Sequence, residues 1–186
     1  MRITPEKFIS EMEQDIFQML HKAKTHRELG LDVLKAKPRE NAWSALECFE
    51  HLNRYSSFYL DAFEKKIRKA VQPKRFSPGW LGKKSADSML PKEGEIKNKM
   101  KTFKSKNPSV DGHVDKDAVN QFIEDQERLL KMMEGLKKAD LNVRVSTTLL
   151  LLKFKMGDAL AFYINHELRH MVQIENTLTK VSQSVA

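Results

Sequence analysis

The sequence predicts an all-α protein whose main elements form a four-helix bundle. Its 186 residues include only seven Gly and six Pro, and they are rich in residues that favour helix over sheet. Four long segments carry apolar side chains at steps of three and four residues, as in a helix with one buried face. No segment shows the alternation expected of a strand. We therefore expect a single domain, residues 1–186, with a long irregular insertion at about residues 72–114 between the second and third helices.

The first predicted helix begins close to the N-terminus. Thr4 suits the N-cap, Pro5 suits the first helical position, and Glu6 places an acid in the first turn. An apolar stripe follows at helical spacing: Phe8, Ile9, Met12, Ile16, Met19, Leu20 and Ala23. A short helical piece is expected at residues 29–35, ended by Pro38.

The second predicted helix begins at a capping box. Ser44 and Glu47 have the S-x-x-E spacing in which each side chain binds the backbone N–H of the other residue. Trp43 precedes them, where it can pack onto Cys48. The helix is expected to end near Ala70, and its apolar stripe is Leu46, Phe49, Leu52, Phe58, Leu60, Phe63 and Ile67.

Residues 72–114 break the helical pattern. Proline and glycine recur there: Pro73, Pro78, Gly79, Gly82, Pro91, Gly94, Pro108 and Gly112. An irregular segment of this length is uncommon in a compact domain and is either functional or mobile. We expect one short helix within it, containing Ile96, Met100 and Phe103. Trp80 is either part of a lid over a site or a local hydrophobic anchor.

Positive charge is concentrated in the middle of the chain. The net charge is +8, and the stretch from Glu64 to Lys106 holds fourteen Lys or Arg against four Asp or Glu. Such a patch can attract nucleic acid or an acidic partner. Lys outnumbers Arg there and no recognised nucleic-acid motif accompanies it, so we expect a solvated loop and no nucleic-acid partner.

The last two predicted helices complete the bundle. The third spans about residues 116–138, with Val119, Phe122, Ile123, Leu129, Leu130, Met133 and Leu136 facing inward. A connection, residues 140–156, follows, in which residues 147–154 are either extended or a buried turn. The fourth helix spans residues 157–175, with Asp158 as its N-cap.

Two histidines on the fourth helix form half of a candidate metal site. His166 and His170 are four residues apart, so they lie about 40° apart around the helix axis and about 6 Å apart along it. His51 lies within the second helix, and a bundle brings side chains of facing helices into one shared site. Three imidazoles suit zinc, nickel, iron or copper. Three protein ligands also leave a position open, as in catalytic sites.

The segment His166–His170 also fits the H-E-x-x-H motif of zinc proteases, in which Glu167 would be the general base. Three features argue against a protease. No histidine follows the motif, Gln173 and Asn176 stand where metzincins need Gly and His, and Arg169 places a charge between the two histidines. The protease is therefore a remote alternative.

Other side chains near these histidines have two interpretations each. Gln173 either orients a ligand or packs against a neighbouring helix. Tyr163 could line the pocket, although core packing is favoured, and Cys48 is expected to be a small buried hydrophobe. Glu167 is expected at the rim of the site or as a support for a ligand. The remaining histidines are expected on the surface: His21, His26 and His113.

Two separated blocks of the sequence carry a family resemblance. The first runs from Trp43-Ser44-Ala45-Leu46-Glu47 to His51-Leu52, and the second runs from Gly157-Asp158-Ala159-Leu160 to His166-Glu167-Leu168-Arg169-His170 and Gln173-Ile174. In order and spacing they resemble the DinB-like superfamily of metal-dependent hydrolases and thiol transferases. The basic insertion, with Gly79–Gly82 and Met100–Lys104, is similar to that of one uncharacterised branch.

The resemblance implies a DinB-like four-helix bundle in which His51, His166 and His170 bind a divalent ion, nickel or zinc. It implies an enzyme that acts on a small molecule, either as an S-transferase using a low-molecular-weight thiol or as a hydrolase. It also favours a homodimer. A different hypothesis is a non-catalytic metal-binding or stress-related module whose basic loop contacts an acidic partner.

The expected location is the cytoplasm. The longest apolar run, Leu149–Leu152, is too short to span a bilayer, and the first residues lack the apolar core of a signal peptide. A lone cysteine, Cys48, excludes an internal disulfide and suits a reducing compartment.

Overall fold

The computed structural model describes residues 2–67, 74–92, 95–96, 100–148 and 152–185. Its helices are α1 (Pro5–Arg27), α2 (Leu31–Lys35), α3 (Ala45–Ile67), α4 (Trp80–Met89), α5 (Pro108–Asp111), α6 (Ala118–Lys137) and α7 (Met156–Val185), with a 3-10 turn, η1, at Lys104–Lys106. Two short strands are β1 (Arg144–Ser146) and β2 (Lys153–Lys155). The mostly helical fold is confirmed, but it also contains this small two-stranded sheet, and β2 begins within the segment expected to be extended or a buried turn.

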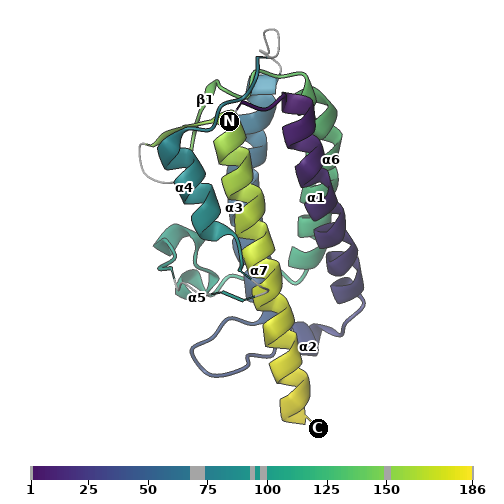
Figure 1. The fold of residues 1–186 in the computed structure, drawn as a ribbon. Helices are drawn as coiled ribbons and strands as arrows, with labels where there is room; N and C mark the ends of the chain where they lie inside the picture. Colours follow the sequence, from purple (N-terminus) through teal and green to yellow (C-terminus); the bar gives the residue numbers. More distant parts are fainter. Residues whose placement is uncertain (1, 68–73, 93–94, 97–99, 149–151, 186) are drawn as a thin grey trace.

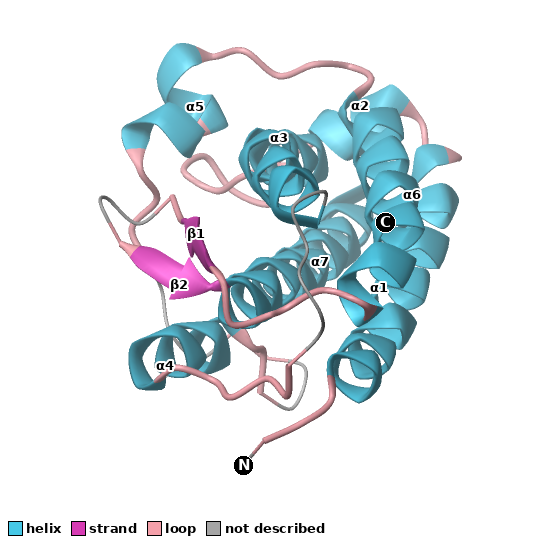
Figure 2. Ribbon diagram, turned by 90° about the horizontal axis from the view of Figure 1, so that it is seen from above, coloured by secondary structure: helices cyan, strands magenta, loops and turns pink. Residues whose placement is uncertain are grey.

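The four longest helices lie side by side around the main core (Figure 1). Helix α1 packs against α6, α3 packs against both α6 and α7, and α7 also contacts α1. Seen from above, α4 and the two strands lie to one side of these helices (Figure 2). The core is rich in large aromatic and aliphatic side chains, among them Phe49, Tyr59, Phe63, Phe122, Leu160 and Tyr163.

Local sequence signals explain where α1 and α3 begin. The Thr4 hydroxyl accepts a hydrogen bond from the Lys7 backbone N–H at 3.4 Å, and Pro5 is the first helical residue. At α3, the Ser44 N–H donates to Glu47 Oε2 at 2.8 Å and the Glu47 N–H donates to Ser44 Oγ at 3.1 Å. These contacts satisfy backbone N–H groups that have no partner inside the helix, so both predicted starts are confirmed. The predicted end of α3 near residue 70 lies outside the described residues.

The strands connect α6 to α7. They pair antiparallel, with Val145 opposite Phe154, and both of these side chains are buried in the core. The chain enters α7 directly from β2, so α7 begins at Met156 and extends to Val185, well past the predicted end. Asp158 therefore lies in the first turn of α7, and its prediction as the N-cap is wrong.

The carboxylate of Asp158 instead holds the start of α4. Its Oδ2 accepts from the Gly79 N–H at 2.8 Å, and the Asn165 side chain donates to the Ala86 carbonyl at 2.9 Å. A Cβ on Gly82 would lie 2.6 Å from Asp158 Cβ, so glycine permits this close approach of α4 to α7. As a result, α4 has a buried face, which the sequence did not predict.

The rest of residues 72–114 also differs from the prediction. Ile96, Met100 and Phe103 lie outside any helix, and residues 97–99 lie outside the described residues. Regular structure appears later instead, in η1 and α5, both of which contact α3. The segment is thus only partly irregular.

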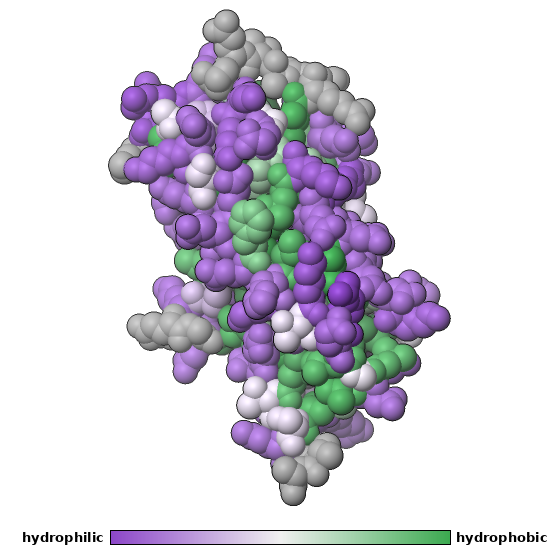
Figure 3. All heavy atoms as spheres, turned by 90° about the vertical axis from the view of Figure 1, so that its right-hand side faces the viewer, coloured by the Kyte–Doolittle hydropathy of each residue, from purple (hydrophilic) through white to green (hydrophobic). Residues whose placement is uncertain are grey.

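The face of the molecule formed by α1 and α6 is mainly hydrophilic, with a discontinuous band of hydrophobic atoms (Figure 3). Phe17 of α1 is 58% exposed. Every described helix is too short or too polar to cross a lipid bilayer.

Candidate metal centre

The fold brings His51 of α3 together with His166 and His170 of α7. One nitrogen from each ring lies within 4.8 Å of the others. The ring centroids are 4.5 Å apart for His51 and His170, 4.6 Å for His166 and His170, and 5.2 Å for His51 and His166. We call these three residues the histidine cluster. All three rings are buried, between 1% and 8% exposed.

A backbone carbonyl from η1 fixes the orientation of His51. Its Nδ1 lies 2.6 Å from the Lys106 carbonyl oxygen, and since a carbonyl can only accept, Nδ1 carries the proton. Neutral His51 then has its lone pair on Nε2. That atom lies 3.3 Å from Nε2 of His166.

Burial keeps the histidine cluster neutral. Desolvation lowers the pKa of His51 to about 4, and the pKa values of His166 and His170 fall well below 6.5 for the same reason. Neighbouring charges also lower these pKa values: Arg54 and Lys106 act on His51, and Arg169 acts on the two α7 histidines. Neutral imidazoles are the form that binds metal ions.

The nitrogens of the histidine cluster fit a metal ion. Nδ1 of His166 and Nδ1 of His170 are buried and have no hydrogen-bond partner among the described residues. On the other side of the rings, Nε2 of His51 lies 3.3 Å from Nε2 of His166. Two nitrogens bound to one zinc ion at about 2.0–2.1 Å lie roughly 3.3 Å apart in tetrahedral geometry. The cluster therefore needs only small side-chain adjustments to hold one ion.

Aromatic rings surround the histidine cluster. The centroid of Trp43 lies 4.8 Å from that of His51 and 6.0 Å from that of His170. The ring centroid of Tyr55 lies 4.5 Å from that of His166 and 5.0 Å from that of His51. Tyr55 is one turn after His51, so helical spacing could have identified it, whereas no sequence pattern points to Lys106.

A family comparison gives an independent line of argument. A family model described as the DinB superfamily matches residues 23–174, which include all three histidines and most of the chain. The chain belongs to the DinB superfamily. Members of this superfamily generally bind metal, and the histidine cluster is compatible with that property. No match was found among the curated proteins or among the solved structures.

In this DinB chain, Glu167 faces away from the histidine cluster and into the core. It is fully buried, and Gln126 of α6 donates to its Oε1 at 2.8 Å. Burial raises the pKa of Glu167 to about 8, so it is a neutral acid at pH 7. Glu167 is therefore not at the rim of the site, and its position does not suit the general base of a zinc protease.

The remaining neighbours are divided between site and core. Gln173 lies close enough to His170 to influence its pKa, so it borders the site. Tyr163 is in the core, where its hydroxyl lies 2.9 Å from the Ser56 hydroxyl. Cys48 is fully buried, and desolvation raises the pKa of its thiol, as expected for a small hydrophobe.

One of the other histidines is not on the surface. His26 is only 5% exposed and its Nε2 lies 3.3 Å from Glu175 Oε1, so its predicted exposure is wrong. His21 and His113 are exposed, as predicted.

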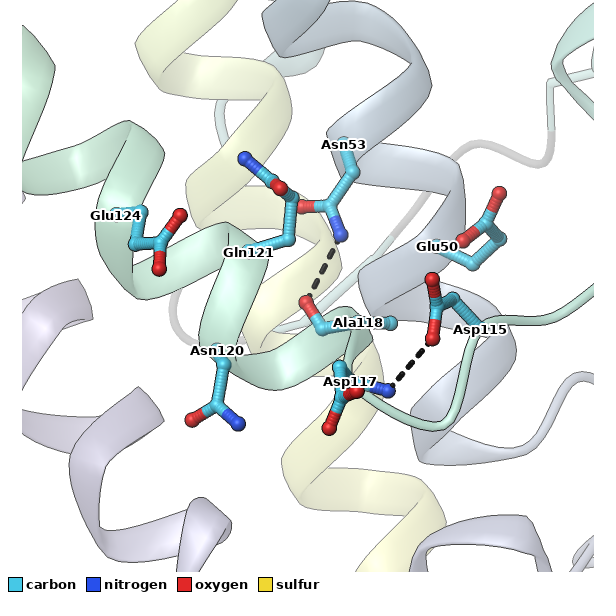
Figure 4. Close-up of a pocket in the computed structure, with 8 residues that line it drawn as sticks. All are labelled: Glu50, Asn53, Asp115, Asp117, Ala118, Asn120, Gln121 and Glu124. Atoms are coloured by element: carbon cyan, nitrogen blue, oxygen red, sulfur yellow. Dashed lines mark hydrogen bonds between the residues drawn. The ribbon is translucent and has the colours of Figure 1, made fainter.

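A cleft of about 450 Å³ lies between α3 and the start of α6 (Figure 4), and none of the three histidines lines it. Four acids line it: Glu50, Asp115, Asp117 and Glu124. Among the residues that the structure describes, these acids do not bring three ligand atoms as close together as the histidines do. The cleft is thus not a second candidate metal centre.

Proposed function

We propose that His51, His166 and His170 hold one divalent metal ion, nickel or zinc, and that the protein is a metal-dependent enzyme. Its reaction would be the transfer of a small thiol to an electrophile, or the hydrolysis of a small molecule. The convergence of three buried, neutral imidazoles from two helices supports this proposal most strongly. Membership of the DinB superfamily supports it independently.

The metal would supply an open coordination position for a thiol or water and would lower the pKa of that ligand. The protein supplies the surroundings. Trp43 and Tyr55 cover the histidines with apolar rings, and burial limits the access of bulk water. A dry site strengthens electrostatic interactions with a bound anion.

The charges around the histidine cluster favour an anionic ligand. Arg54, Lys106 and Arg169 are the charged side chains that act on the pKa values of the cluster. Arg54 also pairs with Glu50 Oε1 at 2.8 Å, and a thiolate or a hydroxide would bring further negative charge that these cations attract. We therefore favour a thiolate-transfer or hydrolytic reaction over one that develops positive charge.

The proposal extends to the architecture. We infer that α1, α3, α6 and α7 are the four-helix bundle of a single DinB-like domain and that residues 72–114 are an insertion between its second and third helices. We also propose that the protein forms a homodimer, through a surface such as the hydrophobic band of Figure 3, and that it is cytoplasmic.

An activity assay that varies both the metal and the histidine ligands tests the proposed function. Protein stripped of metal and reloaded with Zn²⁺ or Ni²⁺ should catalyse the reaction of a low-molecular-weight thiol with an electrophile, or hydrolyse a small ester or amide. The His51→Ala variant should lose this activity, whereas His21→Ala, at an exposed position, should retain it. Equal rates in wild type and His51→Ala would contradict the proposal.

A second candidate, a non-catalytic metal-binding or stress-related module, is favoured by two observations. The three histidine side chains are buried, and the cleft of Figure 4 is lined by other residues. On α4, Trp80 is 78% exposed with the Lys84 ammonium 5.3 Å from its ring centroid, a combination suited to an acidic partner. Binding to an acidic resin that is lost in Trp80→Ala/Lys84→Ala but unaffected by His51→Ala would support this candidate.

A further inference from the structure

The segment of residues 104–109, which includes η1, packs against the face of α3 that carries His51. Their spacing of four, three and one residues places four side chains on that face: Glu47, His51, Arg54 and Tyr55. Contacts from η1 and α5 reach α3 along it. The 104–109 segment thus directly contacts a predicted metal ligand.

Four contacts hold the segment against this face. The Lys106 carbonyl accepts from His51 Nδ1 at 2.6 Å, and the Lys106 ammonium donates to the Arg54 carbonyl. The Lys106 ammonium also lies 5.5 Å from the ring centroid of Tyr55. Ser109 Oγ donates to Glu47 Oε1 at 3.0 Å. The carbonyl that contacts the imidazole is therefore held from both sides.

These contacts have a consequence for metal binding. A histidine ligand usually donates its second ring N–H to a fixed acceptor, which sets the tautomer and the ring orientation and improves the ligand. The Lys106 carbonyl is such an acceptor for His51, and no donor group could take its place without reversing the tautomer. His166 and His170 have no comparable partner at Nδ1 among the described residues. His51 is thus the member of the cluster whose lone pair is positioned in advance.

We propose that the 104–109 segment is part of the metal centre and that Lys106 and Ser109 are positioning residues for His51. The Lys106 carbonyl holds His51 with Nε2 toward the other two histidines. The Lys106 ammonium and the Ser109 hydroxyl hold that carbonyl in place. The metal affinity of the bundle then depends on a segment outside it. This inference rests on the proposed metal site.

The test compares metal affinity in matched variants of the full chain. Lys106→Met keeps most of the side-chain stem but removes the ammonium, and Ser109→Ala removes the hydroxyl. Lys104→Met is the control, because Lys104 is an exposed lysine of the same 3-10 turn. Dissociation constants for Zn²⁺ and Ni²⁺ are measured by competition with a chromophoric chelator.

We expect the double variant Lys106→Met/Ser109→Ala to bind metal about 10-fold or more weakly, in the range seen when partners of metal ligands are removed. Lys104→Met should stay within about twofold of wild type, and Lys106→Arg should restore part of the loss. In a His51→Ala background, Lys106→Met should have no further effect, because it acts through His51. Wild-type affinity in the double variant, or an equal loss without His51, would overturn the proposal. If the double variant does not fold, the single variant Lys106→Met decides by the same criteria.

A spectroscopic measurement separates this proposal from the metal site itself. Long-range proton–nitrogen NMR spectra of metal-free protein with labelled histidine report the tautomer of His51. We expect Nδ1–H in wild type and a mixture of tautomers in Lys106→Met/Ser109→Ala. If wild type binds no metal but shows this change, the proposed function fails and the positioning of His51 stands. An unchanged tautomer in the variant would refute the positioning role.

Discussion

At the scale of single residues, two adjacent side chains of α7 point in different directions. His166 faces the histidine cluster, whereas Glu167, about 100° further around the axis, faces α6 and Gln126. The buried carboxyl is stable there because it is neutral. Asp125, with a pKa that burial raises to about 6, lies near enough to raise the pKa of Glu167 further. The protonated acid therefore lies in the core, where the hydrogen bond from Gln126 joins α6 to α7.

This arrangement predicts a pH dependence of stability. The folded-state pKa of Glu167, about 8, lies above its ordinary value of 4.5, so the stability it contributes is full below pH 4.5 and is lost as the pH rises through 8. The loss is at most about 1.4 kcal/mol per pH unit within that window. Glu167→Gln keeps a neutral side chain of similar shape and should remove this slope. Urea unfolding of metal-free protein at pH 5.5 and 7.5 measures the difference, and equal pH dependence in both proteins would contradict it.

Trp43 offers an optical signal of metal binding. It is one of two tryptophans in the chain and lies against His51 and His170, whereas Trp80 is exposed on α4. Ni²⁺ or Co²⁺ quenches a nearby indole, so titration should quench the emission of Trp43. Quenching should be lost in Trp43→Phe and kept in Trp80→Phe. Quenching that survives in Trp43→Phe would place the bound ion elsewhere.

At the scale of elements, the sequence predicted the parts whose signals are local. The capping box at Ser44 and Glu47 and the apolar periodicity of the long helices depend on neighbouring residues only, and these predictions are confirmed. The convergence of His51 with the α7 histidines was also predicted, because the pair spacing and a bundle suffice to bring them together.

Elements that depend on distant contacts were not predicted. Helix α4 is held by Asp158 and Asn165 of α7, which are remote in sequence, and its short apolar pattern was hidden among proline and glycine. Asp158 is not an N-cap because the chain enters α7 directly from β2, so the helix begins at Met156. The role of Lys106 rests on a carbonyl, which carries no side-chain signature in a sequence.

Because α4 packs closely on α7, adding a single methyl group at Gly82 should lower the free energy of unfolding. In Gly82→Ala the new Cβ would lie within 2.8 Å of three Asp158 atoms. Such overpacking costs about 1–3 kcal/mol, more than the roughly 1 kcal/mol that alanine gains in a helix, so we expect a net loss on the order of 1 kcal/mol. Ser85→Ala in the same helix should change the free energy of unfolding by less than about 0.5 kcal/mol. Denaturant unfolding compares the two, and a Gly82→Ala protein as stable as wild type would show that α4 is not closely packed on α7.

At the scale of the whole molecule, the proposed ion would link helices that are distant in sequence. Its ligands come from α3 and α7, and the positioning carbonyl comes from η1. An ion that binds the folded chain alone stabilises it by mass action. The stability of the fold and the loading of the site should therefore change together.

Thermal unfolding tests this linkage. At a free metal concentration 100-fold above Kd the stabilisation is about 2.7 kcal/mol, which corresponds to roughly 5–10 °C in Tm for a chain of this size. A chelator should reverse the rise. His21→Ala should show the same rise as wild type, and His170→Ala should show little. A Tm that does not respond to metal in wild type would argue against an ion held between α3 and α7.

Metal analysis of purified protein tests the central claim most directly. Wild type and His21→Ala, each equilibrated with Zn²⁺ or Ni²⁺ and freed of excess ion, should contain about one ion per chain. His166→Ala should contain much less, because it keeps only two of the three imidazoles. Stoichiometric metal that persists undiminished in His166→Ala would contradict the account.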